Sequence, residues 1–169
     1  MKGSDVTRIL VTALLLLAGG ALAQPGPCNA PQNSQFDFWL GTWQVSTGGK
    51  VVGRNVVAKV QGGCTVTENY HAVGGPYEGS SFNWYDPAGD RWHQVWVDNG
   101  GTRLMLRGGL KDGSMVLTGE RTLQGAVVSD RITWTPNPDG SVRQHWEQSR
   151  DGGLGWGTIF DGLYTPVAP

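Results

Sequence analysis

The chain has 169 residues, enough for one domain of ordinary size once a leader is removed. Charged residues make up only 16% of it, hydrophobic residues 38%, and eight residues are tryptophan, which excludes a disordered chain of high net charge and few aromatics. Lys and Arg number 13 against 14 Asp and Glu, a formal net charge of −1. Without a basic excess to meet phosphates, we expect no nucleic-acid partner.

Residues 1–23 have the pattern of a secretory signal peptide. Lys2 and Arg8 precede the apolar run 9–17, and Ala21-Leu22-Ala23 has the small residues that a signal peptidase recognises. The run is shorter than the about 20 apolar residues that span a bilayer, so a membrane anchor is the less favoured alternative. We expect a periplasmic or secreted protein with no membrane contact after cleavage.

Residues 24–35 are interpreted as an N-terminal arm, rich in proline and carrying the first of two cysteines. Cys28 and Cys64 are predicted to pair in an oxidising compartment and to tie the arm to the body of the protein. A reactive thiol is the alternative, and neither cysteine has a basic or histidine neighbour in sequence to activate it.

The remainder, residues 36–169, predicts one all-β domain. No stretch after the arm has helical periodicity, while glycine-rich turns interrupt β-rich runs along the whole chain, which is typical of an antiparallel sandwich or barrel. A short helical plug is expected near residues 35–40. The chain predicts an up-and-down barrel of about ten strands, at residues 42–47, 51–60, 64–73, 79–85, 91–98, 102–110, 114–121, 126–135, 141–149 and 156–164.

Two hairpins repeat one template, since Trp84 and Trp96 are twelve positions apart, as are Trp134 and Trp146. Turns centred on Ala88 and on Pro138 would put all four indoles on one face of the sheet, because side chains alternate along a strand. That face is predicted to be the inner one, since the opposite face would bury several arginines and histidines without partners. The outer set is then Asn83, Arg91, His93, Arg131, Arg143, His145 and Glu147.

The first strands place one acid and one base on the inner wall. Turns at Gly48-Gly49 and Gly62-Gly63 would set Trp43 across from Arg54, and would turn Arg54 and Glu68 inward. Two interpretations are open for this arginine. It could close the base of the barrel by a cation–π contact with Trp43, or it could anchor a ligand.

Flat rings with a few convergent polar groups are typical of a small-molecule pocket, whereas a purely structural core prefers Leu, Ile and Val. We therefore predict that the lumen binds one small molecule and that no metal or cofactor is required. The expected ligand-binding residues are Arg54, Glu68, Trp84, Trp92, Gln94, Trp96, Asp130, Trp134, Gln144 and Trp146.

Two other functions remain alternatives to a binding protein. Glu68 and Asp130 could act as acid and base on a bound sugar-like ligand, since glycosidases use two inward carboxylates. The barrel could also be a structural or interaction module without a cavity. The histidines are scattered at 71, 93 and 145, without a metal-binding spacing.

Four stretches resemble a group of secreted bacterial proteins of unknown function with lipocalin-like (calycin-like) barrels. They are 36–43 (FDFWLGTW), 79–86 (GSSFNWYD), 92–98 (WHQVWVD) and 143–149 (RQHWEQS). The start Gly41-x-Trp43 is also similar to lipocalins and to the heme-binding nitrobindin barrels. The resemblance implies a barrel of about ten strands and no established activity. A nitrobindin-like heme ligand would fall nearest to His145, which the predicted register turns outward.

A second resemblance is local. Ser149-x-Asp151-x-Gly153-x-x-Trp156 is similar to the Asp-box turn of sialidase-like propellers, with Gly155 where threonine is usual. In that motif the aspartate accepts backbone N–H bonds and the tryptophan packs beneath. It implies a stabilised hairpin turn and no catalytic role.

Overall fold

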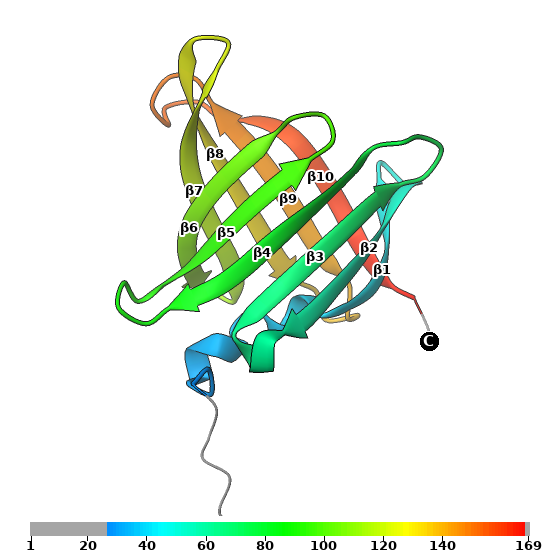
Figure 1. Cartoon of the computed structure of the whole chain (residues 1–169). Coiled ribbons are helices and arrows are strands. Elements are labelled where there is room, and N and C mark those ends of the chain that lie inside the picture. The colour runs from blue at the N-terminus through cyan, green and yellow to red at the C-terminus, as the bar shows by residue number, and fades with distance from the viewer. Residues whose placement is uncertain (1–26, 168–169) are drawn as a thin grey trace, which may run out of the picture.

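A computed structural model describes residues 27–167, so the predicted signal peptide lies outside the described residues. Ten antiparallel strands form a closed barrel in which each strand pairs with its chain neighbours and the last returns to the first (Figure 1). All ten predicted strands are present, with ends within two residues of those expected. The strands are β1 (Gly41–Thr47), β2 (Lys50–Val60), β3 (Thr65–Ala72), β4 (Glu78–Asp86), β5 (Arg91–Asp98), β6 (Arg103–Lys111), β7 (Ser114–Leu123), β8 (Ala126–Pro136), β9 (Val142–Ser149) and β10 (Gly157–Pro166).

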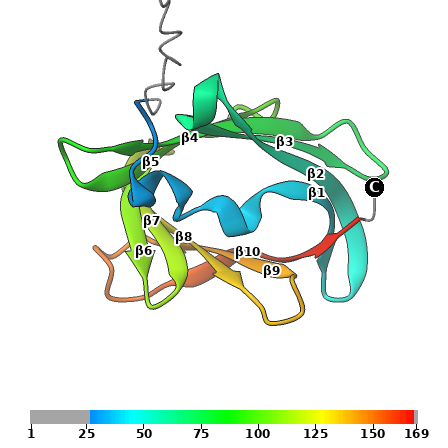
Figure 2. The same ribbon diagram turned by 90° about the horizontal axis from the view of Figure 1, so that it is seen from below.

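Short 3₁₀ helices η1 (Pro31–Ser34) and η2 (Asp37–Trp39) cross the lower opening of the barrel, which Figure 2 shows from below. Phe36 and Trp39 are fully buried there. The Phe36 ring lies 5.7 Å from Trp92 and 5.2 Å from Trp134, between ring centroids. The expected helical plug is confirmed, and its aromatic rings fill the base of the barrel.

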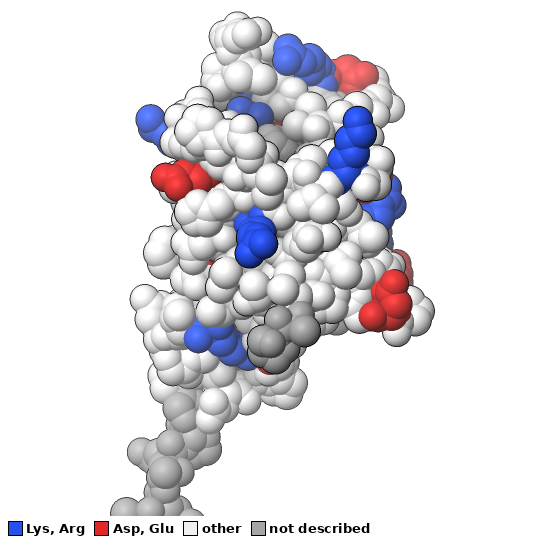
Figure 3. Space-filling model, turned by 90° about the vertical axis from the view of Figure 1, so that its right-hand side faces the viewer, with Lys and Arg blue, Asp and Glu red and all other residues white. Residues whose placement is uncertain are grey.

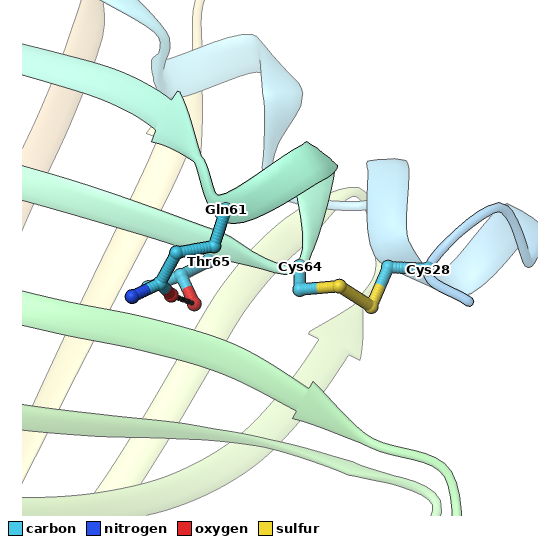
Figure 4. The surroundings of a disulfide bond; sticks show 4 residues. All are labelled: Cys28, Gln61, Cys64 and Thr65. Atoms are coloured by element: carbon cyan, nitrogen blue, oxygen red, sulfur yellow. Dashed lines mark hydrogen bonds between the residues drawn. A yellow bond between two sulfur atoms is a disulfide. The ribbon is translucent and has the colours of Figure 1, made fainter. Parts of the chain in front are cut away.

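The predicted disulfide is present between Cys28 and Cys64 (Figure 4). Cys64 follows helix η3 (Gln61–Gly63), which connects β2 to β3, and the Thr65 hydroxyl donates a 2.6 Å hydrogen bond to the Gln61 side-chain oxygen. The Cys28–Cys64 disulfide therefore ties the segment before η1 to the same end of the barrel that the plug closes.

The second Trp hairpin has the predicted face but a different pairing. Trp134 pairs with Gln144 and Ile132 with Trp146, two positions away from the predicted register. The loop between Pro136 and Val142 has an odd number of residues, so even-numbered residues of both strands still share a face. A shift of two residues keeps the side chains inside.

The prediction for the first Trp hairpin was wrong by one residue, which is enough to turn β4 over. Trp84 pairs with His93, because the loop from Pro87 to Asp90 has four residues. Trp84 and Phe82 consequently point outward, and Phe82 is 53% exposed. Asn83, expected outside, is fully buried.

Strand β2 is turned over for a similar reason. A bulge between Val45 and Ser46 in the β1–β2 pair sets Trp43 across from Asn55, and Arg54 across from Gln44 on the outer face. Both interpretations of Arg54, as the cation–π clamp on Trp43 and as an inward ligand anchor, are therefore wrong. Asn55 takes the inward position and is fully buried.

The outer surface mixes charges of both signs. On the face that Figure 3 shows, basic and acidic side chains of the described residues lie interspersed among neutral ones. Arg143 and Asp161 form one such outer pair, with 2.7 Å between Nε and Oδ1. Within residues 27–167, no helix has the length and apolar character needed to cross a membrane.

Candidate functional site

The barrel contains a cavity of about 190 Å³ above its filled base. It reaches solvent near Tyr77, in the loop between β3 and β4, and near Ile159 at the start of β10, at the end of the barrel opposite the plug (Figure 1). Both side chains are partly exposed, at 41% and 50%. The wall is formed by Glu68, Tyr70, Tyr77, Gln94, Trp96, Leu104, Ile132, Gln144, Trp146, Ile159, Phe160 and Tyr164.

Glycines make room for the aromatic rings of this wall. A Cβ atom on Gly79 would lie 2.2 Å from the Trp96 ring, and one on Gly53 would lie 2.3 Å from the Tyr70 hydroxyl oxygen. Both distances are far below van der Waals contact, so only glycine lets these rings lie against the strands. Because glycine has no side chain, Gly53 and Gly79 leave the space that these two rings occupy in the cavity wall.

The polar hydrogens of the aromatic wall are bonded to the protein. The Tyr70 hydroxyl donates to the Val52 carbonyl at 3.2 Å, and the Tyr164 hydroxyl donates to the Gln144 side-chain oxygen. Trp146 Nε1 donates to Asp130 Oδ1 at 2.8 Å. These bonds fix the rings in place and leave few free donors in the wall.

At the rim of the cavity, the Asp98 carboxylate accepts hydrogen bonds from two further aromatic side chains. Asp98 Oδ2 accepts from the Tyr77 hydroxyl at 2.8 Å and from Trp96 Nε1 at 3.1 Å. Partial burial opposes ionisation of Asp98, but these bonds and a backbone N–H from Thr102 outweigh it and lower its pKa below 3.8. Asp98 is thus ionised at neutral pH.

Glu68 is the only carboxylate in the cavity wall of the described chain, and it is 3% exposed. Asn55 Nδ2 donates to its Oε1 and the Ser81 hydroxyl to its Oε2, each at 2.8 Å. Burial raises the pKa of Glu68 to about 7, although both hydrogen bonds favour the ionised form. Near neutral pH this carboxyl exists in both protonation states.

The structure separates the ten predicted ligand-binding residues into four groups. Gln94, Trp96, Gln144, Trp146 and Glu68 line the cavity together, as predicted. Trp92 and Trp134 also point inward but pack against the plug, at 2% and 0% exposure, and do not reach the cavity.

Arg54 and Trp84 form the third group, and their predicted inward orientation was wrong. Both lie on the outer face, where the Trp84 ring stacks on His93 with 5.2 Å between centroids. The cavity wall accordingly contains neither of these two side chains.

Asp130 faces the barrel interior, but its carboxylate oxygens are already used in an ion pair and in hydrogen bonds with neighbouring side chains. Its carboxylate forms a 2.8 Å ion pair with Arg121 Nε and accepts from Trp146 Nε1 at 2.8 Å and Gln148 Nε2 at 3.3 Å. It is 1% exposed and does not line the cavity. The two-carboxylate arrangement of a glycosidase is therefore not formed at the cavity, and Asp130 instead orients the Trp146 ring.

Sequence reasoning did not assign seven of the twelve wall residues to the site. The residues that it missed are Tyr70, Tyr77, Leu104, Ile132, Ile159, Phe160 and Tyr164. The available signal was glycine within strands, because Gly53, Gly79 and Gly162 each lie against one aromatic ring.

A second hollow, of about 780 Å³, lies over the outer faces of β5, β6 and β7 beside the β9–β10 loop. That loop has the expected Asp-box contacts. Asp151 Oδ1 accepts from the Gly155 backbone N–H at 2.9 Å, and Trp156 packs under the Arg131 guanidinium at 4.1 Å. The motif stabilises the turn, as predicted.

No group of three or more His, Cys, Asp and Glu side chains within residues 27–167 is arranged to hold a metal ion. His145 lies on the outer face, across from Thr133, and its Nε2 is 3.0 Å from the Thr158 hydroxyl. The sequence matches no protein-family model and no curated protein sequence. The assignment of the cavity as the candidate site is therefore based on its geometry alone.

Proposed function

We propose that this protein is an exported binding protein that holds one small molecule in the aromatic-lined cavity of its barrel. The observation that supports this most directly is the contrast between the two ends of the lumen. Phe36, Trp39, Trp92 and Trp134 fill the base completely, while the other end keeps an open space of about 190 Å³ walled by rings and isolated polar groups.

The size of this space indicates the size of the ligand. An apolar cavity of about 150 Å³ is known to hold benzene. The cavity therefore suits a molecule of one ring, or a branched molecule of similar volume, rather than a heme or a long lipid chain.

Export is supported by the Cys28–Cys64 disulfide, because such bonds persist mainly in oxidising compartments. The same proposal includes kinship with the lipocalin-like barrels. It is supported by the ten-stranded closed barrel and by the position of Gly41-x-Trp43 at the start of β1.

Native mass spectrometry of protein purified from its own exported compartment tests the proposal. We expect an added mass corresponding to one small molecule, lost on mild unfolding. Addition of the released molecule should quench tryptophan fluorescence through Trp96 and Trp146, which both line the cavity.

Three variants make the fluorescence test specific to the lumen. Trp96→Phe and Trp146→Phe should each lose part of the quenching, whereas Trp84→Phe, on the outer face, should keep all of it. Protein that carries no retained molecule, or quenching that depends on Trp84, would contradict a binding site in the lumen.

A further inference from the structure

Among the described residues, the cavity has one carboxylate and no basic side chain in its wall. None of its wall residues in the described chain is Lys, Arg or His. Two basic side chains close to the barrel interior are already paired, Lys59 with Asp37 at the plugged end and Arg121 with Asp130. A negatively charged ligand would find no counter-charge here.

The hydroxyl and indole donors of the wall are also used. Tyr70, Tyr77 and Tyr164, as well as Trp96 and Trp146, all donate to protein acceptors. Their ring faces and edges remain for the ligand. Aromatic rings attract cations through the negative potential over their faces.

Glu68 supplies a charge without a partner. Its two hydrogen-bond donors, Asn55 and Ser81, are neutral, so no cation of the described chain balances the ionised carboxylate. The Oδ1 atom of Asn55 is buried beside it and has no hydrogen-bond donor within residues 27–167. Asn55 does not line the cavity, so Glu68 alone presents this uncompensated charge to a ligand.

Building on the proposed function, we propose that the ligand is a small organic cation, an ammonium with apolar substituents, that sits among the aromatic rings and is paired with Glu68. The aromatic rings and the uncompensated carboxylate both favour a cation over an anion. The cavity volume of about 190 Å³ limits the substituents to one ring or a few methyl groups.

Choline and 3,3-dimethylbutan-1-ol test the inference, because they have nearly the same shape and differ in charge. We expect calorimetric titration at pH 8 to show choline binding at least tenfold more tightly than the neutral alcohol. Glu68→Gln should remove this preference. Glu120→Gln, on the exposed face of β7, should retain it.

The pH dependence of the unsubstituted protein gives a test that needs no variant. Choline keeps its charge at every pH, so its affinity should fall about 100-fold from pH 8 to pH 5 as Glu68, with a pKa of about 7, becomes protonated. Burial raises the pKa values of Tyr70, Tyr77 and Tyr164 around it, so these groups stay neutral over this range. Asp98 at the rim stays ionised, since its pKa is lowered.

The possible outcomes distinguish a failure of the cation proposal from a failure of the proposed binding function. If the alcohol binds as tightly as choline, or binds alone, a cationic ligand is refuted while a binding lumen stands. A choline affinity independent of pH, or a preference kept in Glu68→Gln, refutes the role of Glu68. If neither compound binds at millimolar concentration, the cation is refuted, and the retained mass described above decides whether the lumen binds anything else.

Discussion

Replacing Glu68 by Gln should stabilise the protein at alkaline pH and leave it unchanged at acid pH. In the folded protein the pKa of Glu68 is about 7, against 4.5 for the ordinary group. Between these values the folded state keeps a proton that the unfolded chain has lost, so the free energy of unfolding falls as the pH rises. The fall levels off above pH 7, and the pKa difference corresponds to about 3 kcal/mol.

Glutamine has the same shape and no charge, so it should not share this loss. Its amide oxygen can keep the hydrogen bond from Asn55 Nδ2, and its amide nitrogen can donate to the Ser81 hydroxyl oxygen. We therefore expect Glu68→Gln to match the unsubstituted protein below about pH 4, to exceed it slightly at pH 5 and to exceed it by about 3 kcal/mol at pH 8.

Urea denaturation at pH 5, 6, 7 and 8 measures the difference directly, because the titrations of all other groups cancel between the two proteins. Glu120→Gln, on the outer face, is the control and should show a difference that does not change with pH. A stability difference for Glu68→Gln that is flat from pH 5 to pH 8, or that favours glutamate as the pH rises, would refute the assignment of a buried, unpaired carboxyl.

Three further predictions concern stability. Reducing Cys28–Cys64, which joins residues 36 positions apart, should cost about 2–4 kcal/mol in urea denaturation, and two free thiols in the exported protein would contradict the bond. Trp134→Ala should cost about 3–5 kcal/mol because this ring is fully buried, whereas Trp84→Ala should cost about 1 kcal/mol; equal costs would argue against the assigned faces. Asp130→Ala should cost about 3 kcal/mol by leaving its arginine partner without a counter-charge, and a cost under about 1 kcal/mol would show that the ion pair is unimportant.

The strands and the plug were predictable because they follow from local patterns. Glycine turns delimit β-rich runs, and the aromatic cluster at residues 36–39 can be buried only at an open end of the barrel. The disulfide followed from the presence of two cysteines and a leader. None of these inferences depends on the exact pairing of distant residues.

Which side chains of a strand point into the barrel was less predictable, because this depends on whether the preceding or following loop has an odd or an even number of residues. The estimate for the turn after Trp134 was wrong by two positions and kept the correct face, while that for the turn after Trp84 was wrong by one and reversed it. The bulge at Val45 and Ser46 had the same effect on Arg54. Loop conformation, rather than hydrophobic pattern, decided these residues.

Much of the cavity wall depends on contacts between strands that are distant in sequence. Phe160 and Tyr164 of β10 reach the same space as Tyr70 of β3, and no spacing in the sequence relates them. The inward orientation of Glu68 was predicted from the turn of its own hairpin. Its raised pKa, however, depends on the burial that the whole closed sheet provides.

The aromatic plug has a kinetic consequence. Since Phe36 and Trp39 block one end of the lumen, a bound molecule leaves by the same route by which it arrived, past Tyr77 and Ile159. Arrival and departure then cross one shared barrier. A substitution that narrows this passage without touching the bound molecule should slow both rate constants by the same factor and leave the equilibrium affinity as it was.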